Sequence, residues 1–573
     1  MDKDIHKIME LVGNKQCYII FIIIINLILW INVSVVNYSL AFIETKPEVI
    51  YNDRGNYIAK KLNYDICDKY EYIITKDYKY SIITDFKDGT ECNKLKNSLI
   101  GTFHSFGVLL GNFLFQVIPS KMGYKNLLVY FHYLHAVLVL ISIFYKNYYY
   151  FQVLNCCIMF LTKIILNTSL VISNEIIDLK YKSLISSFIN SGNGLGGMFY
   201  VLMYYLLEDW RYVFIVSVCI TIVSGIIIHI FYHESLAHLL IKKDYNKFYE
   251  TLLYMAKKNN REKQFEEGIT NNEEYKKCLE QLKNYTLPEK SENDLEKKED
   301  IKNEENKEDK LGINKQKINQ DELLKIKENS SQRNLDQKSD INPGLTSDKK
   351  LFNIKSSKKI KGNFFHLFKY SSVRYTAIIL SVGWFCNAAL FYGLVIGIKT
   401  LKGSQYRNTA ILYLCDFFAY NLSGLFSNSK LGRKLSLQIF TFGYGVFCLV
   451  MCFTFDYNKN VVVGFYFCAR LSMICAFCVY YSYAFESYPL SVANYGYSLN
   501  SATCSVAGIV IPFIIEYLKE KYVFLIYGIF GVVCSALFFF LKETRGMPRA
   551  DNIKEIEEEM RKEQQKQLEN KKN

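Results

Sequence analysis

Three ionisable side chains lie in the middle of long apolar stretches of this 573-residue chain: Lys163, Asp416 and Arg470. An ionisable group at the centre of a bilayer costs about 3 kcal/mol or more, so such residues usually face a cavity or one another and mark a functional site. The chemistry they indicate is the binding of a charged solute or a coupling ion within a membrane. No spacing typical of a nucleophile, a metal site or a phosphate loop is present, so we predict neither an enzyme nor a cofactor or metal.

Asp416 and Arg470 allow two interpretations. They either form an ion pair that neutralises both charges, or they face a substrate. Lys163 has no acidic residue at a matching depth, which favours contact with an anionic group or a coupling proton. The alternatives for Lys163 are that its chain extends to the membrane surface or bonds to backbone carbonyls.

Long apolar runs must position these residues. A membrane-spanning helix needs about 20 mostly apolar residues, and twelve runs fit that length. They lie near residues 17–38, 97–117, 127–145, 151–174, 184–206, 212–231, 372–398, 408–426, 435–454, 461–484, 496–516 and 522–541. We therefore predict an all-α membrane protein of twelve transmembrane helices in two blocks of six.

The overall composition averages two different kinds of segment. The chain is 50% hydrophobic and 22% charged, and its net charge is +14. Its mean hydropathy is +0.04. Apolar blocks and one Lys, Glu and Asn-rich tract exclude a single soluble core. Lys and Arg concentrate in short loops that the positive-inside rule places in the cytoplasm, so the charge indicates topology rather than a nucleic-acid partner.

These loops predict the domain organisation. Residues 1–16 form a cytoplasmic N-terminus, and residues 17–231 a first six-helix half with an external loop at 44–96. Residues 232–371 form a cytoplasmic linker that is largely disordered, most of all over 242–362, because it has too few apolar residues to order itself. A second half covers 372–541, and a charged cytoplasmic tail covers 542–573. In the external loop, Cys67 and Cys92 either form a disulfide or stay reduced.

Two hexamers at equivalent places in the two halves resemble each other. The first is Ser120-Lys121-Met122-Gly123-Tyr124-Lys125, and the second is Ser429-Lys430-Leu431-Gly432-Arg433-Lys434. Each follows the second helix of its half. The pair indicates a duplicated unit, with a substrate path between the halves. The alternative is two unrelated basic loops that both obey the positive-inside rule.

The ordered motifs resemble the major facilitator superfamily, in particular its organic cation, organic anion and carnitine transporter branch. Beside the hexamers, which are similar to that superfamily's loop signature, the matching motifs are Asp209-Trp210-Arg211, Glu234-Ser235, Trp384-Phe385, Tyr392-Gly393-Leu394, Glu486-Ser487-Tyr488-Pro489 and Glu543-Thr544-Arg545-Gly546. The resemblance implies that the hexamers form a cytoplasmic gate with Glu175, Lys182 and Glu486.

The chain departs from the family pattern at charged positions of this gate. The acidic residue of the loop signature is Ser120 in one half and Ser429 in the other. Tyr124 replaces the second Arg of the first loop, and Ala493 replaces the Arg that follows the Tyr-Pro motif. In the family these charges hold the cytoplasmic face closed in one state.

The resemblance also implies a substrate cavity. Trp384, Phe391 and Tyr392 line it by analogy, and ring faces can attract cations. The alternative is that these rings pack in the core or face lipid. Positions that carry charge in cation or anion carriers read Cys478 and Ser505 here. With neutral residues there and Lys163 in the cavity, the sequence favours a small organic anion or zwitterion.

We therefore predict a secondary transporter of a small organic solute that works by alternating access. The alternative is a non-transporting membrane receptor or scaffold that keeps the fold, which the missing loop acids and the long linker favour. The expected partners are the solute, a coupling ion and the lipid bilayer, with no nucleic acid and a monomeric transport unit. The expected location is the plasma membrane or an organelle membrane.

Overall fold

A computed structural model describes residues 2–13, 17–39, 48–53, 56–62, 64–74, 86, 92–115, 118–144, 147–177, 182–283, 364–489 and 492–545. The chain divides into two units, Met1–Tyr285 with Ile360–Asn573, and Thr286–Lys359. All the described residues belong to the first unit.

The first six predicted runs are helical. They are α2 (Cys17–Asn37), α6 (Lys94–Leu114), α8 (Tyr124–Phe144), α9 (Tyr148–Ile176), α10 (Lys182–Asn190) continued by α11 (Gly192–Leu207), and α12 (Trp210–Phe231). The fifth run is divided at Ser191, where a glycine-rich sequence follows. Glycine weakens a helix interior because it loses the most backbone entropy, so the break falls there.

The second six runs are helical as well. They are α19 (Ser371–Gly397), α20 (Gln405–Asn428), α21 (Gly432–Thr454), α22 (Lys459–Ser487), α23 (Ala493–Tyr517) and α24 (Glu520–Leu537), with short 3₁₀ turns at Ile398–Thr400 and Phe538–Phe540. Ten helices of the described part are long and apolar enough to cross a membrane. Of the twelve predicted spans, α6 is rich in polar residues and α11 has only 16 residues, which explains why they fall short.

The loop between α2 and α6 contains a small sheet. Its elements are β1 (Glu48–Asp53), β2 (Asn56–Lys61), α4 (Tyr64–Lys69) and β3 (Tyr72–Ile74), with the antiparallel strand order β2-β1-β3. Val49 and Tyr51 face a core that includes Ile66. Cys67 and Cys92 are joined by a disulfide, with 5.8 Å between their Cα atoms. This bond ties α4, beside the sheet, to the residues that directly precede α6.

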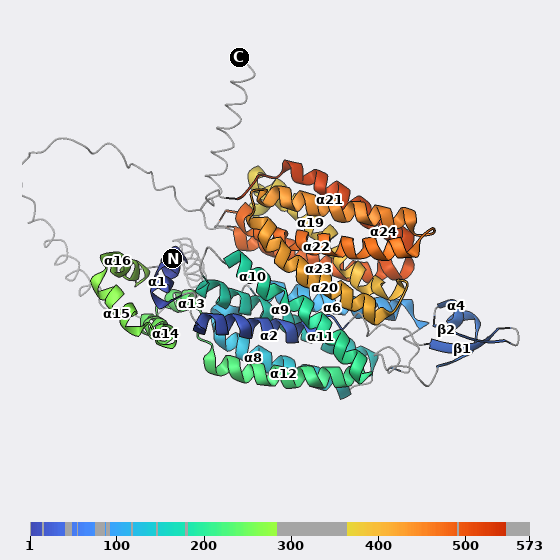
Figure 1. Cartoon of the computed structure of the whole chain (residues 1–573), viewed down its shortest axis with the longest axis horizontal. Helices are drawn as coiled ribbons and strands as arrows, with labels where there is room; N and C mark the ends of the chain where they lie inside the picture. Colours follow the sequence, from blue (N-terminus) through green and yellow to red (C-terminus); the bar gives the residue numbers. More distant parts are fainter. Residues whose placement is uncertain are drawn as a thin grey trace, which may run out of the picture. The chain divides into compact units, whose positions relative to one another are not determined.

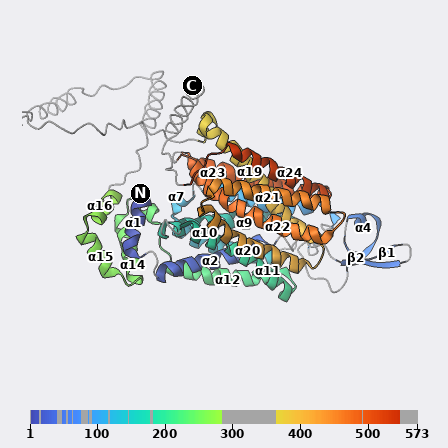
Figure 2. The same ribbon diagram turned by 45° about the horizontal axis from the view of Figure 1, so that its top comes forward.

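Short helices cover one end of the first half. They are α1 (Asp2–Val12), α7 (Ile118–Met122), α13 (Leu236–Ile241), α14 (Tyr245–Lys258), α15 (Glu262–Asn271) and α16 (Glu273–Lys283); a further short helix, α18 (His366–Lys369), precedes α19. Figure 1 and Figure 2 both show α1 beside α14, α15 and α16, and the helices are in contact.

The prediction of a disordered linker is wrong for residues 242–283. Apolar side chains at helical spacing, among them Phe248, Leu252 and Phe265, are buried together with Ile8 of α1. The polar average composition of the tract concealed the helical spacing of these apolar residues. In addition, α1, the helix that covers them, is far away in the sequence. The remaining linker residues, 284–363, and the tail after Arg545 lie outside the described residues.

The two halves meet along α6 with α23 and α11 with α20. The backbones approach closely, because a side chain added at Gly101 of α6 would collide with the ring of Pro512 of α23. Gly197 of α11 likewise lies against the ring of Tyr413 of α20. Small residues allow such close packing between membrane helices. This interface is where the sequence placed the substrate path.

Candidate functional site

Asp416 and Arg470 form a buried ion pair inside the second half. The Nε and Nη2 atoms of Arg470 lie 2.7 Å from the two carboxylate oxygens of Asp416, and both side chains are 0% exposed. Arg470 Nη1 also donates to the Phe391 carbonyl at 3.0 Å, and its guanidinium lies 4.4 Å from the centre of the Phe391 ring. The pair neutralises both charges, so of the two interpretations the structure has the ion pair rather than free substrate-binding charges.

Lys163 lies on α9 and faces the other half. Its chain packs against Gly111 of α6, and its charge acts on the thiol of Cys504 of α23. Lys163 forms no ion pair or hydrogen bond with any residue that the structure describes. Lys163 is therefore an amine at the interface of the halves without an acidic partner in the described part of the chain.

The three predicted cavity aromatics belong to one ring cluster. Trp384 is 0% exposed, and its ring centre lies 4.8 Å from that of Tyr481. Phe391 stacks on Phe477 at 6.0 Å and touches Tyr392 edge to face at 5.4 Å. The rings therefore pack in the core rather than facing lipid. Trp384 and Phe391 pack against rings of α22, whereas Tyr392 lies against Phe391 and Gly508 of α23.

Cys478 and Ser505 occupy different surroundings. Cys478 is half-buried on α22. Ser505 is fully buried on α23, where its hydroxyl donates to the Ser501 carbonyl at 3.2 Å. The amide of Asn112 on α6 approaches the Ser505 hydroxyl at 3.5 Å, so Ser505 lies on the interface between the halves and close to Cys504 in sequence.

The two hexamers adopt the same local structure. Gly123 and Gly432 both have a positive φ, +87° and +77°; Gly123 directly precedes α8, and Gly432 is the first residue of α21. Glycine adopts this conformation without strain. The backbone N–H groups of Tyr124 and Lys125 donate to Glu234, at 2.6 and 3.3 Å.

In the second half, the N–H groups of Arg433 and Lys434 donate to Glu543, at 2.9 and 3.0 Å. Carboxylates in both halves thus cap the start of the third helix, which helix dipoles favour. We missed this role of Glu234 and Glu543 from the sequence. The signal was there, since Tyr124 and Glu234 are 110 residues apart, as are Arg433 and Glu543.

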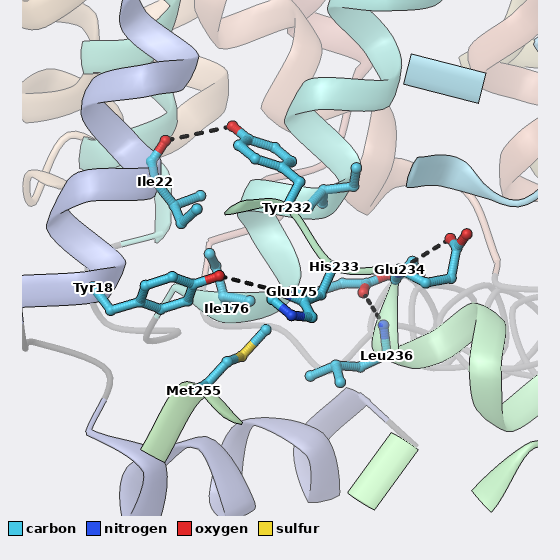
Figure 3. A pocket seen from close by; sticks show the side chains of 11 residues that line it. Tyr18, Ile22, Glu175, Ile176, Tyr232, His233, Glu234, Leu236 and Met255 are labelled. Atoms are coloured by element: carbon cyan, nitrogen blue, oxygen red, sulfur yellow. Dashed lines mark hydrogen bonds between the residues drawn. The ribbon is translucent and has the colours of Figure 1, made fainter. Parts of the chain in front are cut away.

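A second carboxylate completes each motif. Glu175, at the end of α9, accepts from the Ser235 hydroxyl at 2.6 Å and the Leu236 N–H at 2.9 Å, beside a small cavity shown in Figure 3. Glu486, at the end of α22, accepts from the Thr544 hydroxyl at 2.9 Å. The shared pattern of hydrogen bonds supports a duplicated unit over two unrelated loops.

The two motifs differ in one charge. Arg433 forms an ion pair with Glu486, whereas the equivalent residue of the first half is Tyr124. The other predicted gate lysines lie at the surface: Lys121 and Lys430 are exposed, and Lys434 Nζ donates to the Phe539 carbonyl at 2.9 Å. The side chains of Ser120 and Lys182 lie outside the described residues.

The end of the α6–α23 interface away from the hexamers is closed by polar contacts. The Thr102 hydroxyl donates to the Ile509 carbonyl at 3.0 Å, and Ser98 approaches the Pro512 carbonyl at 3.5 Å. Pro512 has no backbone N–H, so the carbonyl of Gly508, one turn earlier, lacks its usual donor and α23 is weakened at this turn. The α6 hydroxyls cross between the halves to this part of α23.

Two six-helix halves with matching gate motifs define a class of membrane protein, and residues 73–512 match the family model of the Major Facilitator Superfamily. The chain belongs to this superfamily, as its motifs predicted, and is a multi-pass integral membrane protein.

The chain is also similar to individual proteins of solute carrier family 22. Over 209 residues the chain is 31% identical to "Solute carrier family 22 member 15-like" of Xenopus tropicalis, a match that covers 35% of this chain and 42% of the relative. Over 197 residues it is 29% identical to "Solute carrier family 22 member 3" of Rattus norvegicus, covering 33% and 35%. The matches thus span less than half the length of these relatives.

Among solved structures, the chain is similar to the partially occluded inward-open xylose transporter XylE from E. coli, with a TM-score of 0.55 and 12% identity. The match covers 92% of this chain and 100% of XylE. At this identity the likeness concerns the fold alone.

Proposed function

We propose that this protein is a secondary transporter that moves a small organic anion or zwitterion by rocking its two halves around a site between them. One chain supplies both halves, so we infer a monomeric transport unit. We infer that the hexamer loops lie on the cytoplasmic side, because the loops and flanks on their side of the membrane together carry more lysine and arginine than the short loops on the other side.

The observation that carries this proposal is Lys163. Asp416 and Arg470 cancel each other at 2.7 Å, so of the three ionisable residues only Lys163 has no counter-charge among the described residues. A charge without a partner inside a membrane protein is costly unless a substrate or ion offsets it. A carboxylate or phosphate on the solute would do so directly, and the nearby rings of Phe391 and Tyr392 can contact its apolar part.

Uptake into proteoliposomes tests this proposal. Radiolabelled anionic, zwitterionic and cationic solutes are compared for the wild type, Lys163→Ala and Lys163→Arg, with Lys263→Ala as the control. Lys263 is exposed on α15, away from the interface. We expect saturable uptake of an anion or zwitterion, a loss of about tenfold or more in Lys163→Ala, and partial rescue by Lys163→Arg, because removing a charge-assisted contact costs about 1.5–3 kcal/mol.

Equal uptake by wild type and Lys163→Ala would remove Lys163 from the mechanism. Uptake of cations alone would contradict the proposed charge of the substrate. No uptake of any solute, together with an intact fold, would favour the receptor or scaffold.

A further inference from the structure

Two histidines lie where the last long helix of the first half continues into the cytoplasmic helices. His233 belongs to the short connection between α12 and α13, and His238 belongs to α13 itself. Both follow the end of the membrane span Trp210–Phe231. Neither residue takes part in the substrate site proposed above, and neither belongs to the hexamers.

His233 connects three helices through its ring. The Tyr18 hydroxyl of α2 donates its one hydrogen to the Phe231 carbonyl at 2.7 Å, and Nδ1 of His233 lies 3.2 Å from the same hydroxyl oxygen (Figure 3). Nδ1 is therefore the donor of this second bond, and a further proton would have to occupy Nε2. The ring also lies against Tyr254 of α14, with 4.3 Å between the ring centres.

His238 is buried against the start of α8. Its residue is 5% exposed, and its ring meets that of Tyr124 edge to face at 5.9 Å. Its Nε2 atom is buried without a hydrogen-bond partner among the described residues. A buried charge is costly unless a counter-charge is bonded to it, so this position suits the neutral ring and disfavours the protonated one.

The surroundings lower the pKa of both rings. Burial, and next the positive charge of Lys125, lower the pKa of His233 to about 4. For His238, burial lowers the pKa, Glu234 raises it by less, and Lys242 lowers it further. Glu234 is itself bound by backbone N–H groups at the start of α8. Both histidines are therefore neutral near pH 7, where an exposed histidine already begins to take up a proton.

Each element packed around the two rings contributes titratable groups. Toward the rings, α2 presents Tyr18, α8 presents Tyr124 and Lys125, α9 presents Glu175, and α14 presents Lys247, Glu250 and Tyr254. The helix α1 also contacts α13, and its described ionisable residues are Lys7, which pairs with Glu274, and the exposed Glu10. Neither histidine forms an ion pair with any of the residues that the structure describes.

The helix that carries His238 also completes the gate motif of the first half. The Ser235 hydroxyl and the Leu236 N–H, at the start of α13, donate to Glu175 at 2.6 and 2.9 Å. If α13 left its place against α8 and α9, Glu175 would lose both donors. The two histidines thus lie at the point where the docking of α13 and the gate motif depend on each other.

We propose that His233 and His238 form a proton-binding site that controls the docking of α13: the neutral rings hold α13 on the first half, and protonation releases it together with the donors of Glu175. On release the charged rings regain water and move away from Lys125 and Lys242. Because both folded pKa values are lowered, the docked state has its full stability above about pH 6.5 and loses it as the pH falls toward about 4. This holds whether or not the protein transports a solute.

Amide hydrogen exchange of the full-length protein in detergent tests this proposal at pH 7.5 and pH 5.0, after correction for the intrinsic pH dependence of exchange. The amides of Leu239 and Lys242 report on α13, because they bond to the Ser235 and His238 carbonyls at 3.0 Å. We expect them to exchange about tenfold or more faster at pH 5.0. A release that returns one histidine pKa from about 4 to about 6.5 becomes about 30-fold more favourable over this range.

Two conservative substitutions remove the titration and keep the contacts. His233→Asn retains a donor toward Tyr18, and His238→Phe retains a ring against Tyr124. The double variant should keep α13 protected at pH 5.0, and each single variant should lose part of the response. His366→Gln, on α18 of the other half, is the matched control and should respond like the wild type.

Wild-type protection of α13 that is the same at both pH values would overturn the proposal. So would an acid response that survives in full in the double variant or, if that variant does not fold, in both single variants. An equal acceleration of the amides of α21 would show a general effect of acid on the protein and would also overturn the site.

Discussion

The ion pair of Asp416 and Arg470 neutralises two buried charges inside the second half. Both side chains are fully buried, and Arg470 is further held by the Phe391 carbonyl and ring. A buried pair contributes little net stability, but removing one partner leaves a buried charge uncompensated.

Asp416→Asn should therefore lower the free energy of unfolding by about 3–5 kcal/mol, because Arg470 then lacks its counter-charge. The double variant Asp416→Leu/Arg470→Met should recover most of this loss, since apolar residues can replace a buried pair. Thermal unfolding in detergent compares the three proteins. An unchanged Tm in Asp416→Asn would contradict the account of a neutralised pair.

The sequence could identify Lys163, Asp416 and Arg470, because a charge within an apolar run is conspicuous. It could not decide which of them pair, since this depends on how α20 and α22 are rotated against each other. The sequence did not identify Glu234 and Glu543 as acceptors for backbone N–H groups of the hexamer loops. In the sequence, a glutamate beside a polar loop cannot be told from a solvent-exposed glutamate. Only the folded chain brings them to backbone N–H groups 110 residues away.

At the scale of elements, the repeated loop motif fixes where α8 and α21 begin. Burial by itself would raise the pKa of Glu543, but hydrogen bonds from the backbone N–H groups of Arg545, Arg433, Lys434 and Thr544 outweigh it and lower the pKa. A lowered carboxyl pKa means that the ionised form stabilises the folded protein.

This stabilisation should be complete well above the unfolded pKa of about 4.3 and should be lost as the pH falls through the lower folded pKa. Glu543→Gln should thus cost about 1–2 kcal/mol at pH 7.5, as expected for partly exposed charge-assisted hydrogen bonds, and much less near pH 3.5. Tm measured at both pH values checks this. Glu280→Gln, exposed on α16, is the control. If Glu543→Gln lowers Tm by the same amount at both pH values, the ionised form of Glu543 is not what stabilises the folded protein.

Hydropathy predicted the twelve helical runs well, because a membrane-spanning helix must satisfy its backbone hydrogen bonds within an apolar run, and ten helices of the described part meet the length and hydropathy of a span. Hydropathy did not predict α13–α16, because their apolar side chains are sparse. These side chains are covered by α1, which lies more than 200 residues earlier in the sequence. The break between α10 and α11 was also missed, since Ser191 and the glycines after it hardly lower the average hydropathy.

At the scale of the whole molecule, the account depends on the two halves moving against each other. The polar contacts of Thr102 and Ser98 with α23 close the end of the interface away from the hexamers. A rocking transporter must break these contacts in another state. Gly101→Leu should favour that state, because a Cβ at Gly101 would lie 2.7 Å from Pro512 Cγ.

The most direct test of alternating access is the labelling rate of a cysteine placed at Ser105, which is 1% exposed and packs against Gly508 of the other half. In a background without the other free cysteines, a membrane-impermeant maleimide is applied from the outside. We predict slow labelling that Gly101→Leu accelerates about 5- to 100-fold, because overpacking costs the closed state about 1–3 kcal/mol. The transported solute should also change the rate. A rate that neither Gly101→Leu nor any solute of the uptake panel alters would contradict alternating access and indicate a rigid membrane scaffold.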